Sequence, residues 1–234
     1  MVDQLKANVK EIIELSPTAK AIRLEFNEKI KFLPGQFLML EFNIDEDRLE
    51  VKEEESTYQR RAFSISSTPS EKLIEITVKK TQQPFVSEYL VDHLKIGDEV
   101  LSSEPKGKFI FNPKKETIFL AAGSGIAPIM SMIRFLDKKK SKIKAHLIYS
   151  NKISEDILWK NDIESASKNN KSFTYEFILT KDSKRISESH LKEFMKNKEV
   201  NFYICGPLEF VRDLYNLLIQ NQISKENIKI EIYE

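Results

Sequence analysis

Apolar residues in the first 112 positions fall in short runs that often alternate with polar residues, a pattern typical of half-buried β-strands. The runs predict strands at 5–15, 21–26, 36–42, 62–66, 73–78, 99–101 and 108–111. Proline and glycine separate them, and only the segment 85–94 has helical spacing. The sequence therefore predicts an antiparallel β-barrel with one helix for residues 1–112.

The pattern changes after residue 112. A continuous apolar run at 117–122 is typical of a parallel strand buried on both faces. A helix is predicted to start at 126, and further strands at 143–149, 173–179, 200–205 and 228–232 alternate with helices at 155–167, 188–195 and 208–218. This alternation predicts an α/β domain with a five-stranded parallel sheet over residues 113–234.

Composition narrows the classes of function. The 37 basic and 36 acidic residues give a net charge of +1, so nothing in the overall charge favours nucleic acid or an anionic membrane as a partner. The N-terminus lacks the apolar core of a signal peptide, and no uncharged stretch is long enough for a membrane helix. We therefore expect an intracellular, cytoplasmic protein without a membrane span.

Metal chemistry is not expected either. The single cysteine cannot form an internal disulfide or hold an iron–sulfur cluster, and the three histidines have no ligand spacing. The acidic segment 43–59 has two interpretations, a solvated hairpin extension or a docking surface for a basic partner.

Three loops follow strands of the predicted parallel sheet, where ligands bind in open α/β folds. In 123–128, two glycines and a helix N-terminus suit an anion such as a pyrophosphate, although a tight structural turn would need the same residues. Cys205, before Gly206-Pro207, is either a small buried hydrophobe or a site residue. Ser150 and Lys152 would favour the 2′-phosphate of NADPH over NADH, or form a solvated polar turn.

Five short motifs together resemble the ferredoxin–NADP reductase superfamily of flavoproteins, and the resemblance covers nearly the whole chain. Three of them match the flavin domain and two the nicotinamide domain, in the family's order: Pro34-Gly35-Gln36-Phe37, Arg61-Ala62-Phe63-Ser64, Pro105-Lys106-Gly107-Lys108-Phe109, Gly123-Ser124-Gly125-Ile126-Ala127-Pro128 and Cys205-Gly206-Pro207.

The resemblance implies a role for individual residues of the first domain. Arg61 would pair with a flavin phosphate, Phe63 would pack on the isoalloxazine ring, and Ser64 would hydrogen-bond near flavin N5. The further flavin-binding residues implied by the resemblance are Ala62, Val78, Lys79, Phe85, Val86 and Ser87. Where the family usually has glycine shortly before this serine, the chain has Gln82-Gln83-Pro84.

In the second domain, the resemblance places Cys205 beside the nicotinamide C4 and brings Glu231 and Tyr233 close to the flavin. The nucleotide-binding residues that it implies are Gly123, Ser124, Gly125, Ile126, Pro128, Ser150, Lys152, Cys205, Gly206 and Pro207. Ser64, Cys205 and Glu231 would act in catalysis.

The resemblance implies an FAD-dependent NAD(P)H oxidoreductase with non-covalent FAD and NADPH or NADH as co-substrate. Hydride would pass to flavin N5, and electrons would then go to a separate acceptor such as a ferredoxin or flavodoxin. Two alternatives stay open. One is a reductase that uses free flavin as its substrate, favoured by the compact length and the altered Gln83-Pro84 segment; the other is an electron-transfer subunit of a larger enzyme, with the acidic segment 45–55 as its docking surface.

Overall fold

The computed structural model describes residues 5–44, 58–81, 85–181 and 185–233. Most of the acidic segment 43–59 and all of 82–84 therefore lie outside the described residues. The chain divides into two compact units, Met1–Lys108 and Phe109–Glu234.

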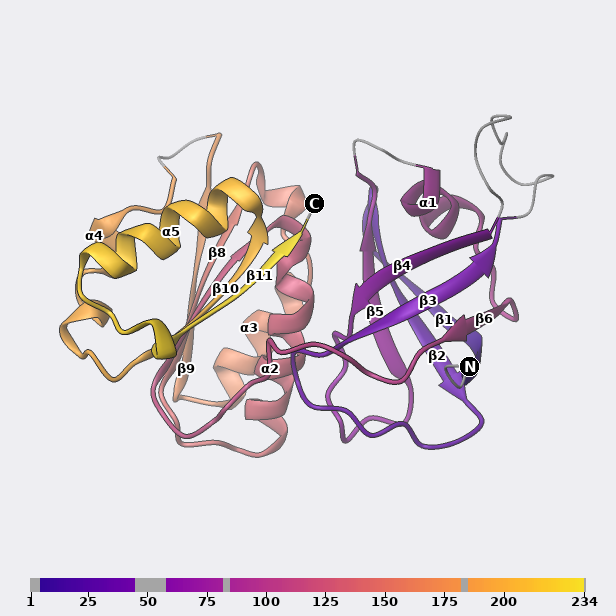
Figure 1. The fold of residues 1–234 in the computed structure, drawn as a ribbon, viewed down its shortest axis with the longest axis horizontal. Coiled ribbons are helices and arrows are strands. Elements are labelled where there is room, and N and C mark those ends of the chain that lie inside the picture. Colours follow the sequence, from indigo (N-terminus) through magenta and orange to yellow (C-terminus); the bar gives the residue numbers. More distant parts are fainter. Residues whose placement is uncertain (1–4, 45–57, 82–84, 182–184, 234) are drawn as a thin grey trace. The chain divides into compact units, whose positions relative to one another are not determined.

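The first unit is an antiparallel sheet of six strands (Figure 1). The strands are β1 (Leu5–Ser16), β2 (Ala19–Phe26), β3 (Phe37–Asn43), β4 (Tyr58–Ser64), β5 (Ile74–Lys79) and β6 (Glu99–Ser102), in the order β4-β3-β6-β1-β2-β5. An isolated bridge between Ile65 and Ile76 joins the two ends of this order and closes the sheet into the predicted barrel.

The short helix α1 (Phe85–Glu88) and the π-helical turn Tyr89–His93 lie at one end of this barrel (Figure 1). Their apolar residues Val86, Leu90 and Val91 join the barrel core with residues of the strands. The predicted helix is therefore present, in two short pieces.

Strand β4 starts before its predicted first residue. Tyr58 to Arg61 are polar or amphipathic, so no strand pattern is visible there in the sequence. Pairing with β3 supplies the missing stabilisation: Arg60 lies opposite Glu41 and forms an ion pair with it at 3.0 Å, and the Tyr58 hydroxyl donates a hydrogen bond to the same carboxylate.

The second unit is a five-stranded parallel sheet with the order β11-β10-β7-β8-β9. Its strands are β7 (Thr117–Ala122), β8 (Ala145–Asn151), β9 (Phe173–Leu179), β10 (Asn201–Pro207) and β11 (Ile228–Tyr233). The helices are α2 (Ile126–Lys138), α3 (Lys160–Asn169), α4 (Glu188–Leu191) and α5 (Leu208–Gln220). Helices α2 and α3 cover one face of the sheet and α5 the other, as right-handed crossovers require (Figure 1).

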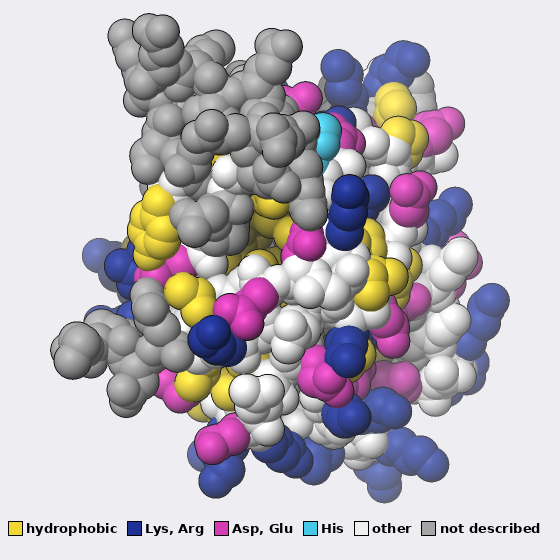
Figure 2. Space-filling view, turned by 90° about the vertical axis from the view of Figure 1, so that its right-hand side faces the viewer, with side chains coloured by type: hydrophobic (Ala, Val, Ile, Leu, Met, Phe, Trp, Pro, Cys, Tyr) yellow, Lys and Arg dark blue, Asp and Glu magenta, His cyan; other side chains and the backbone are white. Residues whose placement is uncertain are grey.

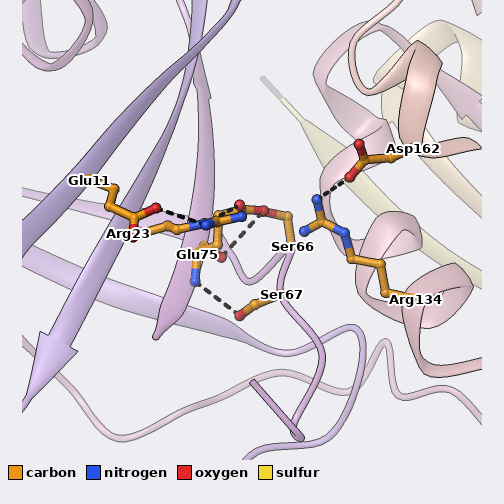
Figure 3. Close-up of polar contacts among 7 residues, drawn as sticks. All are labelled: Glu11, Arg23, Ser66, Ser67, Glu75, Arg134 and Asp162. Carbon is orange, nitrogen blue, oxygen red and sulfur yellow. Dashed lines mark hydrogen bonds and ion pairs between the residues drawn. The ribbon is translucent and has the colours of Figure 1, made fainter. Parts of the chain in front are cut away.

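Two predicted helices are shorter than expected. The helix predicted at 155–167 is replaced by a turn at Ser154–Asp156 followed by α3, because Ile157, Leu158 and Trp159 are all buried and Trp159 has a left-handed φ of 58°. Arg134 on α2 lies 4.4 Å from the centre of the Trp159 ring and forms an ion pair with Asp162 at 2.6 Å (Figure 3). The helix predicted at 188–195 is α4 plus a turn at Phe194–Lys196.

The strand predicted at 108–111 is wrong, since this segment is irregular. Phe109 and Phe111 instead pack against Tyr203 of β10, with ring centres 5.5 and 5.6 Å apart. The Tyr203 hydroxyl accepts a hydrogen bond from the Asn112 amide at 2.9 Å and donates one to the Ile110 carbonyl at 3.2 Å. These contacts explain why the units divide after Lys108, slightly before the predicted domain boundary.

Candidate functional site

Three of the flavin-domain motifs meet in the barrel. Phe37 at the start of β3 is the strand partner of Ser64 at the end of β4. On its other side, Phe37 exchanges two backbone hydrogen bonds of 2.9 Å with Lys106. The amide of Ile65 donates to the Gln36 carbonyl at 3.0 Å. The end of β4 is therefore held between two loops that are far apart in the sequence.

Along β4, exposure falls towards this meeting point. Arg61 and Ala62 are exposed, Phe63 is half-buried and packs against the barrel core, and Ser64 is 5% exposed. In the described part of the chain, the Arg61 guanidinium contacts only the Arg60 carbonyl, at 2.9 Å, and forms no ion pair. An exposed guanidinium without a carboxylate partner is a suitable group for a phosphate.

A polar cluster fixes the turn after Ser64 (Figure 3). Glu75 on β5 is 0% exposed and its carboxylate contacts both Ser66 and Arg23. The Ser66 hydroxyl donates to Glu75 Oε1 at 2.8 Å, and Arg23 Nε donates to Glu75 Oε2 at 3.0 Å. Arg23 also donates to Glu11 at 2.8 Å. Burial lowers the pKa of Arg23, but the two carboxylates outweigh it and raise the pKa overall.

The other predicted flavin residues lie on β5 and α1. Val78 belongs to the barrel core and pairs with Lys20 of β2, and Lys79 pairs with Ala19. The segment after β4 is connected to β5 by the Ile65–Ile76 bridge and by the hydrogen bonds between Ser66, Ser67 and Glu75. In α1, which begins at Phe85, Val86 also belongs to the core, and the buried Ser87 hydroxyl accepts a hydrogen bond from the Thr81 amide at 3.1 Å.

In the second unit, the loop after β7 is in backbone contact with the end of β10. The segment Cys205-Gly206-Pro207, predicted to follow its strand as a loop, forms the last three residues of β10, because all three pair with β11. Residues Gly123–Gly125 form a single tight turn that leads directly into α2. A Cβ atom on Gly125 would lie 2.3 Å from the Cys205 carbonyl oxygen and 2.7 Å from the Gly206 nitrogen. A Cβ on Gly123 would meet no atom within 4 Å. The two predicted nucleotide loops therefore lie side by side, with open space above Gly123.

Tyr149, which the sequence did not identify as a site residue, orients the first of these loops. Its buried hydroxyl donates a 2.8 Å hydrogen bond to the Gly123 carbonyl. Burial raises the pKa of Tyr149 well above its usual value, so the hydroxyl remains a donor at neutral pH. Because the peptide is planar and trans, the Ser124 N–H points away from Tyr149.

Cys205 and Glu231 are neighbours on adjacent strands. They are register partners in β10 and β11, and Cys205 is also paired with Ala121 of β7. Burial, with a smaller contribution from the negative charge of Glu231, raises the pKa of the Cys205 thiol well above its usual value. The thiol is therefore neutral, which excludes a thiolate nucleophile at neutral pH. Glu231 and Tyr233 are both half-buried.

The tip of β8 carries the residues predicted for nucleotide selection. Ser150 lies inside β8 and is 8% exposed, whereas Lys152 beyond the strand is exposed. The Lys181 amide donates to the Lys152 carbonyl at 3.1 Å, so a second exposed lysine lies next to the first. Lys181 was not predicted as a site residue, because the adjacency of two strands does not follow from local sequence patterns.

The charges elsewhere give no single-sign surface on the face shown in Figure 2. On the described part of that face, acidic and basic side chains are interspersed, with basic ones commoner along the lower rim. Among the described residues, no group of His, Cys, Asp and Glu is placed to hold a metal ion. No described helix has both the length and the apolar character to span a membrane.

The residues present fit the two cofactors that the motifs imply. For a flavin, Arg61 offers an accessible cation and Phe63 a partly exposed aromatic side chain next to it on β4. For a nicotinamide nucleotide, the turn before α2 offers backbone amides and the open space above Gly123.

Comparison with known proteins agrees with this division. Residues 6–111 match the family model "Oxidoreductase FAD-binding domain", and residues 119–215 match "Oxidoreductase NAD-binding domain". The flavohemoprotein of Bacillus subtilis (strain 168) is 27% identical over 216 residues, which cover 87% of this chain and 52% of that protein. The phenol hydroxylase P5 protein of Acinetobacter pittii is 26% identical over 99% of this chain and 66% of that protein. The chain thus spans about half the length of its flavohemoprotein relatives.

Solved structures share the fold over the whole chain. The flavohem-like FAD/NAD binding domain of nitric oxide dioxygenase from Vibrio cholerae has a TM-score of 0.84 at 19% identity, with 98% of each chain covered. A ferredoxin NADP+ reductase from Neisseria gonorrhoeae with bound FAD and NADP has a TM-score of 0.78 at 20% identity, with 99% of each chain covered.

Proposed function

This chain belongs to the ferredoxin–NADP reductase superfamily of flavin-dependent NAD(P)H oxidoreductases, and we propose that it passes electrons from NADPH through FAD to a separate acceptor protein. The observation that carries this proposal is the meeting of the Gln36-Phe37, Ser64-Ile65 and Lys106 backbones at the end of β4. When bound there, the flavin supplies the redox chemistry by accepting hydride from the nicotinamide and releasing electrons.

The first unit would hold the flavin by charge, stacking and hydrogen bonds. Arg61 would bind a flavin phosphate and Phe63 would pack on the ring. Ser64 would hold a hydrogen bond at flavin N5. Because strand pairing with Phe37 and the Ile65–Gln36 hydrogen bond fix its backbone, the Ser64 hydroxyl needs little reorganisation. Ala62, Val78 and Lys79 would contribute backbone contacts, and Phe85, Val86 and Ser87 would lie at the pyrophosphate.

The second unit would hold the nicotinamide nucleotide along the carboxyl edge of its sheet. Amides of the Gly123–Ile126 segment would bind the pyrophosphate, supported by the Tyr149 hydrogen bond behind them. Cys205 would bound the nicotinamide pocket as a neutral thiol, and Glu231 and Tyr233 would lie near the reacting rings.

The choice of NADPH rests on the exposed lysines at the tips of β8 and β9. Lys152 and Lys181 provide two ammonium groups, and an acidic residue that would favour a free 2′-hydroxyl does not stand at the tip of β8. A ferredoxin or flavodoxin would suit the electron acceptor. We also infer that the protein acts in the cytoplasm.

A serine substitution tests the proposal. Ser64→Ala should slow the single-turnover reduction of bound FAD by NADPH by at least tenfold and leave the nucleotide Kd within about twofold, because the hydrogen bond matters as charge develops at N5. Ser70→Ala removes an exposed serine after the same strand and should change neither quantity. An unchanged rate of reduction in Ser64→Ala would refute the assignment of this site.

A further inference from the structure

Glu75 has a fully buried carboxylate, although the stability of a barrel core does not require one. Its carboxylate is 0% exposed, while Arg23, which pairs with it, has a side chain that is 33% exposed. Taking a carboxylate out of water costs several kcal/mol, and an apolar residue of similar volume often stabilises a fold as well or better. The carboxylate is therefore expected to contribute by orienting its neighbours and not by stabilising the fold.

What Glu75 orients is the turn after β4. Its side chain accepts the Ser66 hydroxyl, and its backbone carbonyl accepts the Ser66 amide at 2.8 Å. Its own amide donates to the Ser67 hydroxyl at 2.9 Å. One residue of β5 thus holds two consecutive residues of the turn by both backbone and side chain (Figure 3).

The turn begins two residues beyond Ser64. Ile65, between them, donates its amide to Gln36 and forms the bridge with Ile76, the neighbour of Glu75. Ile65 alone separates Ser66 from Ser64, so a displacement of the Ser66 backbone strains the two contacts of Ile65 and, through them, the position of Ser64. Strand pairing with Phe37 holds Ser64 from the other direction.

We propose that Glu75, held in place by Arg23, is a positioning residue that sets the conformation of the Ser64–Ser67 segment for flavin binding. The inference rests on the proposed function in so far as Ser64 contacts the flavin. Glu75 itself acts through Ser66 and touches neither cofactor. Arg23 also contacts Glu11, whose side chain is 49% exposed and lies on the solvent side of this cluster.

Hydrogen exchange of the full-length, flavin-free protein tests the positioning directly. Glu75→Gln keeps an acceptor for Ser66 but removes the charge that holds Arg23, and Ser66→Ala removes the hydroxyl alone. Each should speed exchange of the Ser66 amide by about tenfold, and exchange of amides in the β1–β2 pair should stay unchanged. Glu11→Gln, which alters the exposed partner of the same arginine, is the matched control and should have little effect.

The second measurement is the FAD dissociation constant by fluorescence titration, with FAD reduction followed at saturating FAD. Both variants should weaken FAD binding by about tenfold, and the double variant should bind FAD no more weakly than the worse single one, because both substitutions alter the same contact between residues 66 and 75. Unchanged local exchange and FAD affinity, with a loss only in the free energy of unfolding, would overturn the proposal and leave Glu75 a structural residue.

The same experiments distinguish a failure of the proposed function from a failure of the positioning role of Glu75. If Ser64→Ala leaves FAD reduction unchanged, the assignment of the flavin site is wrong, whatever the exchange data show for Glu75→Gln. If Ser64→Ala slows reduction and neither Glu75→Gln nor Ser66→Ala alters exchange or FAD affinity, only the positioning role of Glu75 is wrong.

Discussion

Adding one methyl group at Gly125 tests the contact between the two nucleotide loops. The backbone of Gly125 has φ −61° and ψ −7°, a conformation that alanine adopts without strain. On backbone grounds alone, Gly125→Ala should stabilise the fold by about 0.4–1 kcal/mol through the unfolded state. The structure predicts instead that Gly125→Ala destabilises the fold.

The reason is steric. The new Cβ would lie 2.3 Å from the Cys205 carbonyl oxygen and 2.6 Å from its carbon, where ordinary contacts begin at 3.4 Å. The neighbours are backbone atoms at the end of β10, so the two loops must separate by about 1 Å. Overpacking of this kind costs about 1–3 kcal/mol, which exceeds the gain and leaves a net loss of about 1–2 kcal/mol. A misplacement of about 1 Å in a nucleotide site is expected to cost about 100-fold in the rate of FAD reduction.

The assay uses Trp159, the only tryptophan of the chain, which reports on the second unit. Its fluorescence during urea unfolding gives the stability of that unit, and stopped-flow reduction of FAD gives the rate. Gly97→Ala is the control: it has φ +96°, and an added Cβ meets nothing within 4 Å. It should cost about 1 kcal/mol in the first unit from backbone strain and leave FAD reduction unchanged. A Gly125→Ala protein that is more stable than the parent and reduces FAD normally would refute the loop contact.

Three further substitutions separate the roles of charge and burial. Arg61→Met should weaken FAD binding by about 10- to 100-fold in a fluorescence titration and change the free energy of unfolding by less than about 0.5 kcal/mol. Arg60→Met, which breaks the ion pair with Glu41, should instead lower the free energy of unfolding and leave FAD binding unchanged. Lys152→Asp should lower the ratio of kcat/KM for NADPH over NADH at least tenfold; Lys171→Asp, before the amino end of β9, should leave that ratio unchanged, and an unaltered ratio in the first variant would contradict the assignment. The raised pKa of Cys205 means that its contribution to stability is complete below the pKa of the unfolded thiol, about 8.5, and is lost as the pH rises towards the folded value. Cys205→Ala should therefore lose stability less steeply than the parent above about pH 8.5 in urea titrations, and parallel curves would argue against a buried neutral thiol.

The strand and helix pattern was predictable where local periodicity coincides with burial. Strand β7 has the predicted bounds because it is a continuous apolar run in a parallel sheet. Strand β9, at the edge of the sheet, also has the predicted bounds, because its apolar and aromatic residues alternate with Thr174 and Glu176. The start of β4 and the irregular segment 108–111 were not predictable, since long-range partners determine both. Arg60 needs Glu41 of β3, and Phe109 and Phe111 need Tyr203 of β10.

Some residues of the candidate site were likewise predictable from the sequence, and others were not. Short motifs identified Ser64, Arg61 and the Gly123–Gly125 turn, because each is a local sequence with a recognisable chemistry. Tyr149 and Glu75 carry no such signal: Tyr149 ends a predicted strand and Glu75 alternates with apolar residues like any solvent-facing strand residue. Their roles depend on pairing with Gly123 and Ser66, which only the folded topology brings together.

The absorbance spectrum of the purified full-length chain, recorded anaerobically, tests the central claim most directly. After FAD is added and the excess removed by desalting, the protein should keep the bands of oxidised flavin, and NADPH should bleach them faster than NADH. A chain that retains no flavin would support the use of free flavin as substrate. Retained flavin that neither nucleotide bleaches would contradict the proposed oxidoreductase function.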